Sequence, residues 1–540
     1  LIFGLPIVAF GMQTRLVSEY EYGAAISALC ASFAYLVLAR VLYAKRRDAL
    51  RALVESFLAL GIVFATLAIP LALDGRWTSA AWALEGAALL WVGIRQERLL
   101  ARAFGLFLQL AAAGAFISRF DLAPIATPVV NSFFLGALFL SVAGLFSNWI
   151  MDKHREGLRG EERAVMAIAF WWGVLWWGVA GISEIDRQVA AALRSHSLLI
   201  FVTLSCIAFS IAHRRWNWPL AKLPMLGLIP AASLVLIVNT NFSGRHPSAA
   251  LGWFAWPVWI ASHFWLLKRH EAQFIRLSPW LHAAGLWLLA IVGAWELGFW
   301  FDFWIASTTV WGLIAWMLVP TALLVMLTAK GERLAWPVAT HYKAYLLHGA
   351  VPLAGFLGLW VIYSTATNDG NPAPLPYVPV LSPLDLAQLG ALVAALSWFK
   401  DCVRKDLIVR AGPRRAFCVL LGSASFVCAN GILLRTLRHH AGVPFNFEQM
   451  LSSMLVQASF SIFWTVLALC TMVTATRMQR RALWITGAGL MGVVVVKLFL
   501  VDLSNIGGVE RIVSFTGVGL LMLVVGYFSP VPPKKAAIPA

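Results

Sequence analysis

Residues 67–105 read LAIPLALDGRWTSAAWALEGAALLWVGIRQERLLARAFG, and this stretch shows how the chain folds. An apolar run over 77–94 lies between Arg76 and Arg95, and a further apolar run begins at Leu99. A helix of about 20 apolar residues crosses the hydrocarbon core of a bilayer. The stretch therefore predicts two membrane-spanning helices joined by a short basic turn.

The composition of all 540 residues extends this interpretation to the whole chain. Hydrophobic residues make up 60% and charged residues 12% of the sequence, and the mean hydropathy is +0.78. A soluble chain is about half apolar and about a quarter charged, so this chain must use lipid as part of its solvent. Because unpaired backbone groups are costly in lipid and alternating apolar and polar strands are absent, we expect an all-α, polytopic integral membrane protein.

Apolar windows bounded by charge, proline or glycine locate the individual helices. After a half-span at 1–11, we expect spans near 22–43, 50–73, 77–94, 99–118, 127–147, 163–182, 194–213, 219–238, 251–268, 279–301, 305–328, 341–365, 384–400, 413–434, 450–475, 482–501 and 511–529. They predict about 17–18 transmembrane helices in a single domain over 1–529, followed by a short cytoplasmic tail at 530–540. The chain starts without methionine and its first run is too short to span, which predicts an N-terminally truncated fragment.

The positions of the basic residues explain the formal net charge of +17. Basic clusters alternate between successive predicted loops, so that about 32 of the 42 Lys and Arg fall on one side of the membrane. Basic loops stay in the cytoplasm, which places the C-terminus there. No basic stripe is interleaved with base-stacking aromatics, so we expect contact with the lipid bilayer and no nucleic-acid binding.

The sequence lacks the common signatures of cofactor and metal sites. Its six cysteines have no metal-ligand spacing, and most lie in apolar runs, which favours packing. No Walker A, GxSxG, HExxH or GxGxxG motif occurs in a usable context. We therefore expect no metal, no cofactor and no ATP or dinucleotide chemistry, and the sequence does not indicate a protein partner.

Two patterns are distinctive: W-T-x-x-x-W-A-L-E-G at 77–86 and K-L-F-L-V-D-L at 497–503. Together with the stretches 67–105 and 480–529 and the opening LIFGLPIVAFGMQTRLV, they resemble the bacterial predicted membrane proteins grouped as domain of unknown function 2339. The resemblance spans essentially the whole chain. It implies a polytopic protein of the bacterial inner membrane and assigns no catalytic residue.

The regions 77–122 and 450–503 also resemble each other weakly. Glu85 precedes a tryptophan as Gln457 does, and each region continues through Arg-Ala and a span to Asp-Leu. The similarity indicates either a parallel internal repeat or chance likeness between leucine-rich helices. Repeats matter because transporters often hold their substrate site at a repeat interface.

Glu85 is the sharpest candidate for a functional residue. It follows Trp77 by eight positions, which places it about 12 Å inside the membrane. A carboxylate there costs a few kcal/mol unless it is paired or protonated. Glu85 is therefore either a proton carrier or an anchor for a cation or hydroxyl group, or a buried carboxyl bonded to a neighbouring helix for packing specificity. Nearby candidates are Asp74, Arg76 and Trp82.

A second candidate is the predicted outer loop 434–449, LRTLRHHAGVPFNFEQ. Arginine forks bind phosphate and carboxylate, and histidine shuttles protons near neutral pH. The loop is either a site for a lipid phosphate or saccharide, or an interfacial loop solvated by headgroups. Its candidate residues are Arg435, Arg438, His439, His440 and Glu448.

The end of the second repeat region supplies the remaining candidates. Lys497 lies four residues inside a predicted outer helix end and precedes Asp502. The structural interpretation is that the lysine side chain extends toward the membrane surface and pairs with this aspartate. Gln457 is the counterpart of Glu85 in the weak repeat.

Three functions fit these features. The first is a transporter or flippase-like protein for a cell-envelope lipid, glycan precursor or small solute, with Glu85 as the intramembrane acid. The second is an envelope enzyme that transfers a group from a lipid-linked donor at the outer face, using Glu85, Asp74 or the histidine pair. The third is a scaffold without chemistry of its own. Expected ligands are envelope lipids or lipid-linked saccharides.

Overall fold

The structure is a computed structural model of the chain. It describes residues 4–20, 22–46, 51–72, 75–118, 127–239, 245–305 and 310–498, together with 516, 523 and 527. Helices and short connections account for all of these ranges, and no strand occurs within them. Twelve helices of this part of the chain are long and apolar enough to cross a membrane. The predicted all-α, polytopic membrane fold is confirmed.

Some predicted spans are absent from these twelve. Helix α18 (Arg481–Lys497) has only 17 residues, and the predicted span 511–529 lies almost entirely outside the described residues. Helices α4 (Gly75–Arg95) and α10 (Gly252–His270) are also absent from the twelve, because glycine, tryptophan and ionisable residues lower their hydropathy. In α3 (Arg51–Ala72), the apolar stretch among the residues whose side chains are described is Leu53–Ala68, which is too short to count among the twelve.

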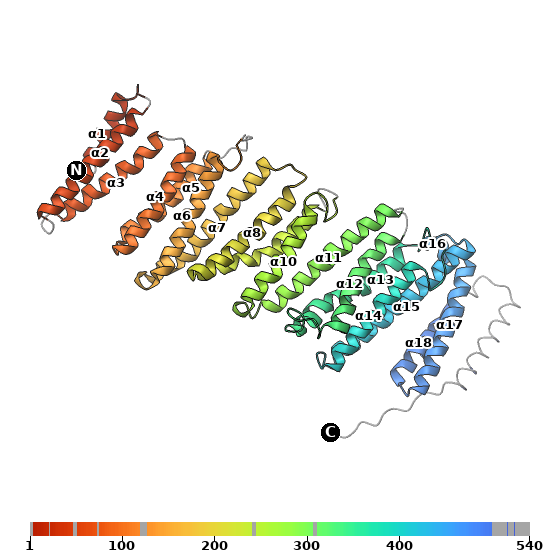
Figure 1. The fold of residues 1–540 in the computed structure, drawn as a ribbon. Helices are drawn as coiled ribbons and strands as arrows, with labels where there is room; N and C mark the ends of the chain where they lie inside the picture. The colour runs from red at the N-terminus through yellow and green to blue at the C-terminus, as the bar shows by residue number, and fades with distance from the viewer. Residues whose placement is uncertain are drawn as a thin grey trace, which may run out of the picture. The chain divides into compact units, whose positions relative to one another are not determined.

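The chain divides into two compact units, Leu1–Phe274 and Ile275–Ala540. In the first unit, consecutive helices pair as hairpins (Figure 1). Its helices are α1 (Gly4–Leu16), α2 (Gly23–Arg46), α3, α4, α5 (Leu99–Ile117), α6 (Ser132–Lys153), α7 (Gly160–Gln188), α8 (Arg194–Trp216), α9 (Leu228–Val238) and α10.

Small residues let the hairpins of the first unit close tightly. A Cβ at Gly86 of α4 would lie 2.5 Å from the carbonyl oxygen of Gly105 in α5, and the reverse distance is also 2.5 Å. Between α6 and α7, a Cβ at Gly144 would lie 2.8 Å from the backbone nitrogen of Gly173. Close backbone approach at small residues is typical of helix packing in membranes.

The predicted span 219–238 is not one α-helix. Residues Pro219–Gly227 form a 3₁₀ segment, and α9 begins only at Leu228. Pro224 has no backbone N–H to donate, and its ring obstructs a regular α-helical turn, so the tighter coil precedes the α-helix.

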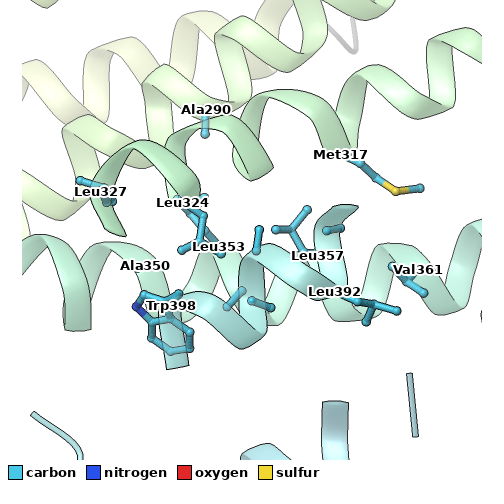
Figure 2. Packing of buried hydrophobic residues seen from close by; sticks show 14 of the residues in the cluster. Ala290, Met317, Leu324, Leu327, Ala350, Leu353, Leu357, Val361, Leu392 and Trp398 are labelled. Atoms are coloured by element: carbon cyan, nitrogen blue, oxygen red, sulfur yellow. The ribbon is translucent and has the colours of Figure 1, made fainter. Parts of the chain in front are cut away.

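The second unit contains a helix bundle with a large apolar core (Figure 2). Leu324 of α12, Leu353 and Leu357 of α13, and Trp398 of α14 belong to this core. The elements of the unit are α11 (Ser278–Trp304), α12 (Trp311–Lys330), the π-helical turn Ala344–Gly349, α13 (Ala350–Thr367), α14 (Pro383–Arg404), α15 (Ala411–Ala441), α16 (Phe447–Ser452), α17 (Met454–Arg477) and α18.

A proline-rich segment, residues 368–382, joins α13 to α14. The Asn368 side chain accepts from the backbone N–H of Gly370 at 2.8 Å, and the indole of Trp311 donates to the carbonyl of Ala373 at 2.9 Å. Side-chain bonds of this kind replace the regular backbone pairing that prolines prevent. The segment is therefore held in a defined position against the bundle.

Candidate functional site

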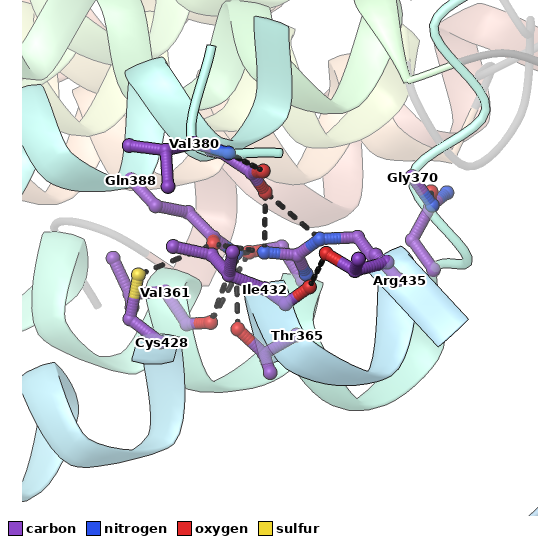
Figure 3. A network of polar contacts seen from close by, with 12 residues as sticks. Val361, Thr365, Gly370, Val380, Gln388, Cys428, Ile432 and Arg435 are labelled. Atoms are coloured by element: carbon purple, nitrogen blue, oxygen red, sulfur yellow. Dashed lines mark hydrogen bonds and ion pairs between the residues drawn. The ribbon is translucent and has the colours of Figure 1, made fainter. Parts of the chain in front are cut away.

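A buried ion pair lies beneath the proline-rich segment. Arg435 of α15 and Asp385 of α14 are both 0% exposed. The Nε atom of Arg435 donates to Oδ1 of Asp385 at 2.9 Å, and the Nη2 atom lies 2.7 Å from the same oxygen as an ion pair (Figure 3). Two buried charges are tolerated only when they pair with good geometry and their other polar atoms are satisfied. The surrounding hydrogen bonds therefore decide whether this pair is stable.

Gln388 connects the ion pair to α13. Its Oε1 atom accepts from Arg435 Nη2 at 2.8 Å, and its Nε2 atom donates to Ser364 Oγ at 2.8 Å and to Thr365 Oγ1 at 3.0 Å. The three-residue spacing from Asp385 places both side chains on one face of α14. The network thus joins α13, α14 and α15 in the centre of the bundle.

The proline-rich segment covers the ion pair. Its Val380 N–H and Tyr377 hydroxyl donate to Asp385 Oδ2 at 3.1 and 3.3 Å. Gly370 has a positive φ of 77°, and a Cβ there would lie 2.3 Å from Cδ of Arg435. Only glycine adopts this conformation without strain while leaving room for the arginine. With four donor contacts, the only carboxylate of this network is saturated by protein groups.

Exposed groups surround the outer side of the cover. The ring of His439 stacks on Tyr377 at a centroid distance of 4.4 Å, and its Nε2 atom lies 3.0 Å from the carbonyl oxygen of Asp369. Arg438 Nε lies 3.7 Å from Asp369 Oδ2. Burial raises the pKa of the Tyr377 phenol above its ordinary value, so the phenol remains a proton donor at neutral pH.

The predicted loop 434–449 is in large part helical. Helix α15 continues to Ala441 and ends at Gly442, whose φ of 69° forms the left-handed cap. Arg435 therefore faces the bundle interior, whereas His439 and His440 are exposed. Glu448 is exposed on the short α16, and the structure shows no contact between it and the histidines. Four of the five candidates therefore lie on α15. Arg435 is buried there and the two histidines are exposed, so they have different roles.

Glu85 lies at the middle of α4, about 15 Å along the helix from either end. It is half-buried, and its Oε2 atom is buried without a hydrogen-bond partner among the described residues. Trp82, one turn away, donates its indole N–H to the carbonyl of Thr66 at 3.0 Å. The carboxyl group of Glu85 is therefore not explained by pairing, in contrast to Asp385.

Lys497 and Gln457 are neighbours in the α17–α18 hairpin. The ammonium of Lys497 donates to the backbone oxygen of Gln457 at 3.0 Å and to Ser461 Oγ at 2.7 Å. Asp502, its expected partner, lies outside the described residues, as does Asp74. The side chain of Arg76 is also outside them. These contacts therefore do not test the predicted pairing of Lys497 with Asp502.

Over residues 1–532, the chain matches the family described as "Predicted membrane protein (DUF2339)". The chain belongs to this family. No curated protein and no solved structure matches it. Membership of the DUF2339 family and the twelve apolar helices together show a multi-pass integral membrane protein.

Sequence reasoning missed Asp385, Gln388 and Tyr377 in this DUF2339 chain. Asp385 and Gln388 are polar residues three apart near the start of a predicted span, which is a recognisable signal. Tyr377 is an aromatic residue in a proline-rich connection, and nothing in its local sequence indicates a contact with α14. Its role depends on how the segment folds back across the bundle.

Proposed function

We propose that this protein is a transporter or flippase-like carrier for a cell-envelope lipid, glycan precursor or small solute. Glu85 is the residue that takes up and releases a proton or cation during transport. The observation that supports this role is the Glu85 Oε2 atom, which is buried in the middle of α4 without a partner among the described residues. Ionisable groups in this situation mark proton relays and ion pathways.

A comparison with other carboxylates of the helices strengthens this assignment. Asp385 is saturated by an arginine and two further donors, and Glu296 Oε1 accepts from the Trp300 indole at 2.7 Å. These acids stabilise structure. A carboxylate without such bonds binds a proton or cation more readily, because no protein donor has to be displaced first.

The proposal includes the location and orientation predicted from the sequence. The protein lies in the bacterial inner membrane with its C-terminus in the cytoplasm, because basic loops are retained there. His439, Arg438 and the proline-rich segment then face the outer side. Substrate enters through the helices of the first unit that flank Glu85.

Transport assays on Glu85 variants test this function. Full-length protein is reconstituted into vesicles that contain fluorescently labelled phosphatidylglycerol, and lipid flipping and proton uptake are followed under an imposed pH gradient. We expect Glu85→Gln to abolish proton uptake and to reduce flipping by about 100-fold or more, the typical effect of losing a proton-transfer group. Glu296→Gln is the matched control and should retain both activities.

Two results would count against transport. Equal proton uptake by wild type and Glu85→Gln would remove the proposed role of this residue. Absence of flux in wild-type vesicles, combined with product formed from a lipid-linked donor, would favour the second function, an outer-face transferase. The exposed His439 beside Tyr377 is the observation that supports that alternative.

A further inference from the structure

A large groove lies within the second unit between α15 and the α17–α18 hairpin. Its volume is about 1560 Å³. Helices α15 and α17 are joined where the Trp464 indole donates to Asn430 Oδ1 at 2.7 Å and its ring lies tilted against Phe426 at a centroid distance of 5.9 Å. From Phe426, the residues of α15 that line the groove continue toward the start of the helix as far as Arg415.

The walls of the groove are apolar despite several hydroxyl groups. Phe426, Leu467 and Leu490 line it. The hydroxyls of Thr471 and Thr486 donate to backbone oxygens of their own helices at 2.7 and 3.1 Å. Because these hydroxyls are already satisfied, they present mainly methyl groups to the groove, and an apolar chain can pack there without stranding a polar group.

Three arginines line one end of the groove. Arg415 lies in the second turn of α15, and Arg480 and Arg481 lie at the turn between α17 and α18. All three are exposed, and none has an ion-pair partner in the part of the chain that the structure describes. A basic pocket between transmembrane helices is a typical binding site for anionic lipid headgroups.

The length of the groove matches one leaflet of a bilayer. The fifteen residues from Arg415 to Ala429 on its α15 wall, with fourteen rises between them, span about 21 Å. Half of a bilayer, headgroup region included, is about 20–22 Å thick. A lipid whose phosphate contacts the arginines can therefore extend its acyl chain along the whole wall.

We propose that this groove binds an anionic phospholipid of the inner leaflet. Its phosphate lies between Arg415, Arg480 and Arg481, and an acyl chain fills the space between α15 and the α17–α18 hairpin. The bound lipid packs against α15 and the hairpin at this end, where the described residues leave the groove open. This site does not depend on the proposed transport by Glu85, which lies in the first unit.

Binding of defined lipids to the full-length chain tests the site. Phosphatidylglycerol or phosphatidylcholine is added to detergent-solubilised protein, and bound lipids are counted by native mass spectrometry. We expect one tightly bound phosphatidylglycerol and much weaker binding of phosphatidylcholine. Replacing Arg415, Arg480 and Arg481 with Gln should weaken phosphatidylglycerol binding about 100-fold, at about fivefold for each cation.

A matched triple variant controls for overall charge. Lys400, Arg410 and Arg477 are exposed basic residues of the same predicted cytoplasmic side that do not line the groove. Replacing these three with Gln should leave binding within about twofold of wild type. Equal losses in the two triple variants would show a general electrostatic effect and overturn the proposal.

A plugging variant tests insertion of the acyl chain. Gly422 lines the groove, and a Cβ at this position meets no atom within 4 Å, so Gly422→Leu fills the groove without a clash. It should lower phosphatidylglycerol binding at least about tenfold with all arginines present. Gly412→Leu, which has the same open surroundings outside the groove, is the control. Unchanged binding by Gly422→Leu would overturn the proposal.

The native cysteines provide an independent readout. Cys418 lines the groove and is exposed, whereas Cys470 is exposed on α17 outside it. Phosphatidylglycerol should slow the reaction of Cys418 with a maleimide and leave the rate at Cys470 unchanged. Equal protection of both cysteines, or of neither, contradicts a lipid in this groove.

Discussion

Asp385 and Glu85 are two acids on helices of the same membrane protein, and their surroundings are opposite. Asp385 is 0% exposed and accepts from Arg435, the Val380 N–H and the Tyr377 hydroxyl. Glu85 is half-buried, and one of its oxygens has no partner among the described residues. The first carboxylate is part of the structure, and the second is available for chemistry.

The difference teaches how a charge in a membrane helix should be interpreted. Burial of a charged carboxylate among membrane helices costs free energy at both sites. At Asp385 it is offset by the counter-ion Arg435 from α15 and by two hydrogen bonds from the proline-rich segment. At Glu85, tight packing of α4 on α5 at Gly86 brings backbone close without supplying a donor. The chemical role therefore follows from the neighbours and not from the residue type.

The largest expected effect comes from breaking the buried ion pair. Asp385→Leu leaves the Arg435 charge buried without its counter-ion and should lower the free energy of unfolding by about 3–5 kcal/mol. Denaturant titration of the full chain in detergent, followed by tryptophan fluorescence, measures this change. The double variant Asp385→Leu with Arg435→Met should recover most of the loss, because it removes both charges. A loss below about 1 kcal/mol in the single variant would contradict the comparison.

A smaller effect is expected at the cover of the ion pair. Gly370→Ala forces a side chain into a positive φ and toward Arg435 Cδ, so the free energy of unfolding should fall by about 1–3 kcal/mol. The same titration measures it. Gly355→Ala in the middle of α13 is the control, because a Cβ there meets nothing within 4 Å and alanine favours the helix. Equal stability of Gly370→Ala and wild type would show that the segment does not cover the pair.

The smallest effect on stability is expected at Glu85. Glu85→Gln removes a charge that no described donor binds, so the free energy of unfolding should change by less than about 1 kcal/mol, with either sign. This result, together with lost proton uptake, separates function from stability at one position. A loss as large as that of Asp385→Leu would instead place Glu85 among the structural acids.

Local sequence predicted the parts of the candidate sites that depend on one helix. Glu85 was identified because a single acid interrupts an apolar run, and the alternation of basic clusters between successive loops placed arginines at helix ends such as those beside the groove. The position of Arg435 was not predicted correctly from composition alone. Its segment is polar enough to suggest a loop, but α15 continues to Gly442 because the helix buries Arg435 against Asp385.

By itself, the sequence determined that this chain is an all-α, multi-pass membrane protein, because hydropathy and chain length leave no other way to satisfy the backbone in lipid. It also determined which residues are charged within that environment. Only the tertiary structure decided which of these charges are neutralised, because the partners of Asp385 come from α15 and the proline-rich segment. Hydrogen bonds between segments distant in sequence have no local signature, and they determine whether a buried acid stabilises the fold or remains available to a proton or cation.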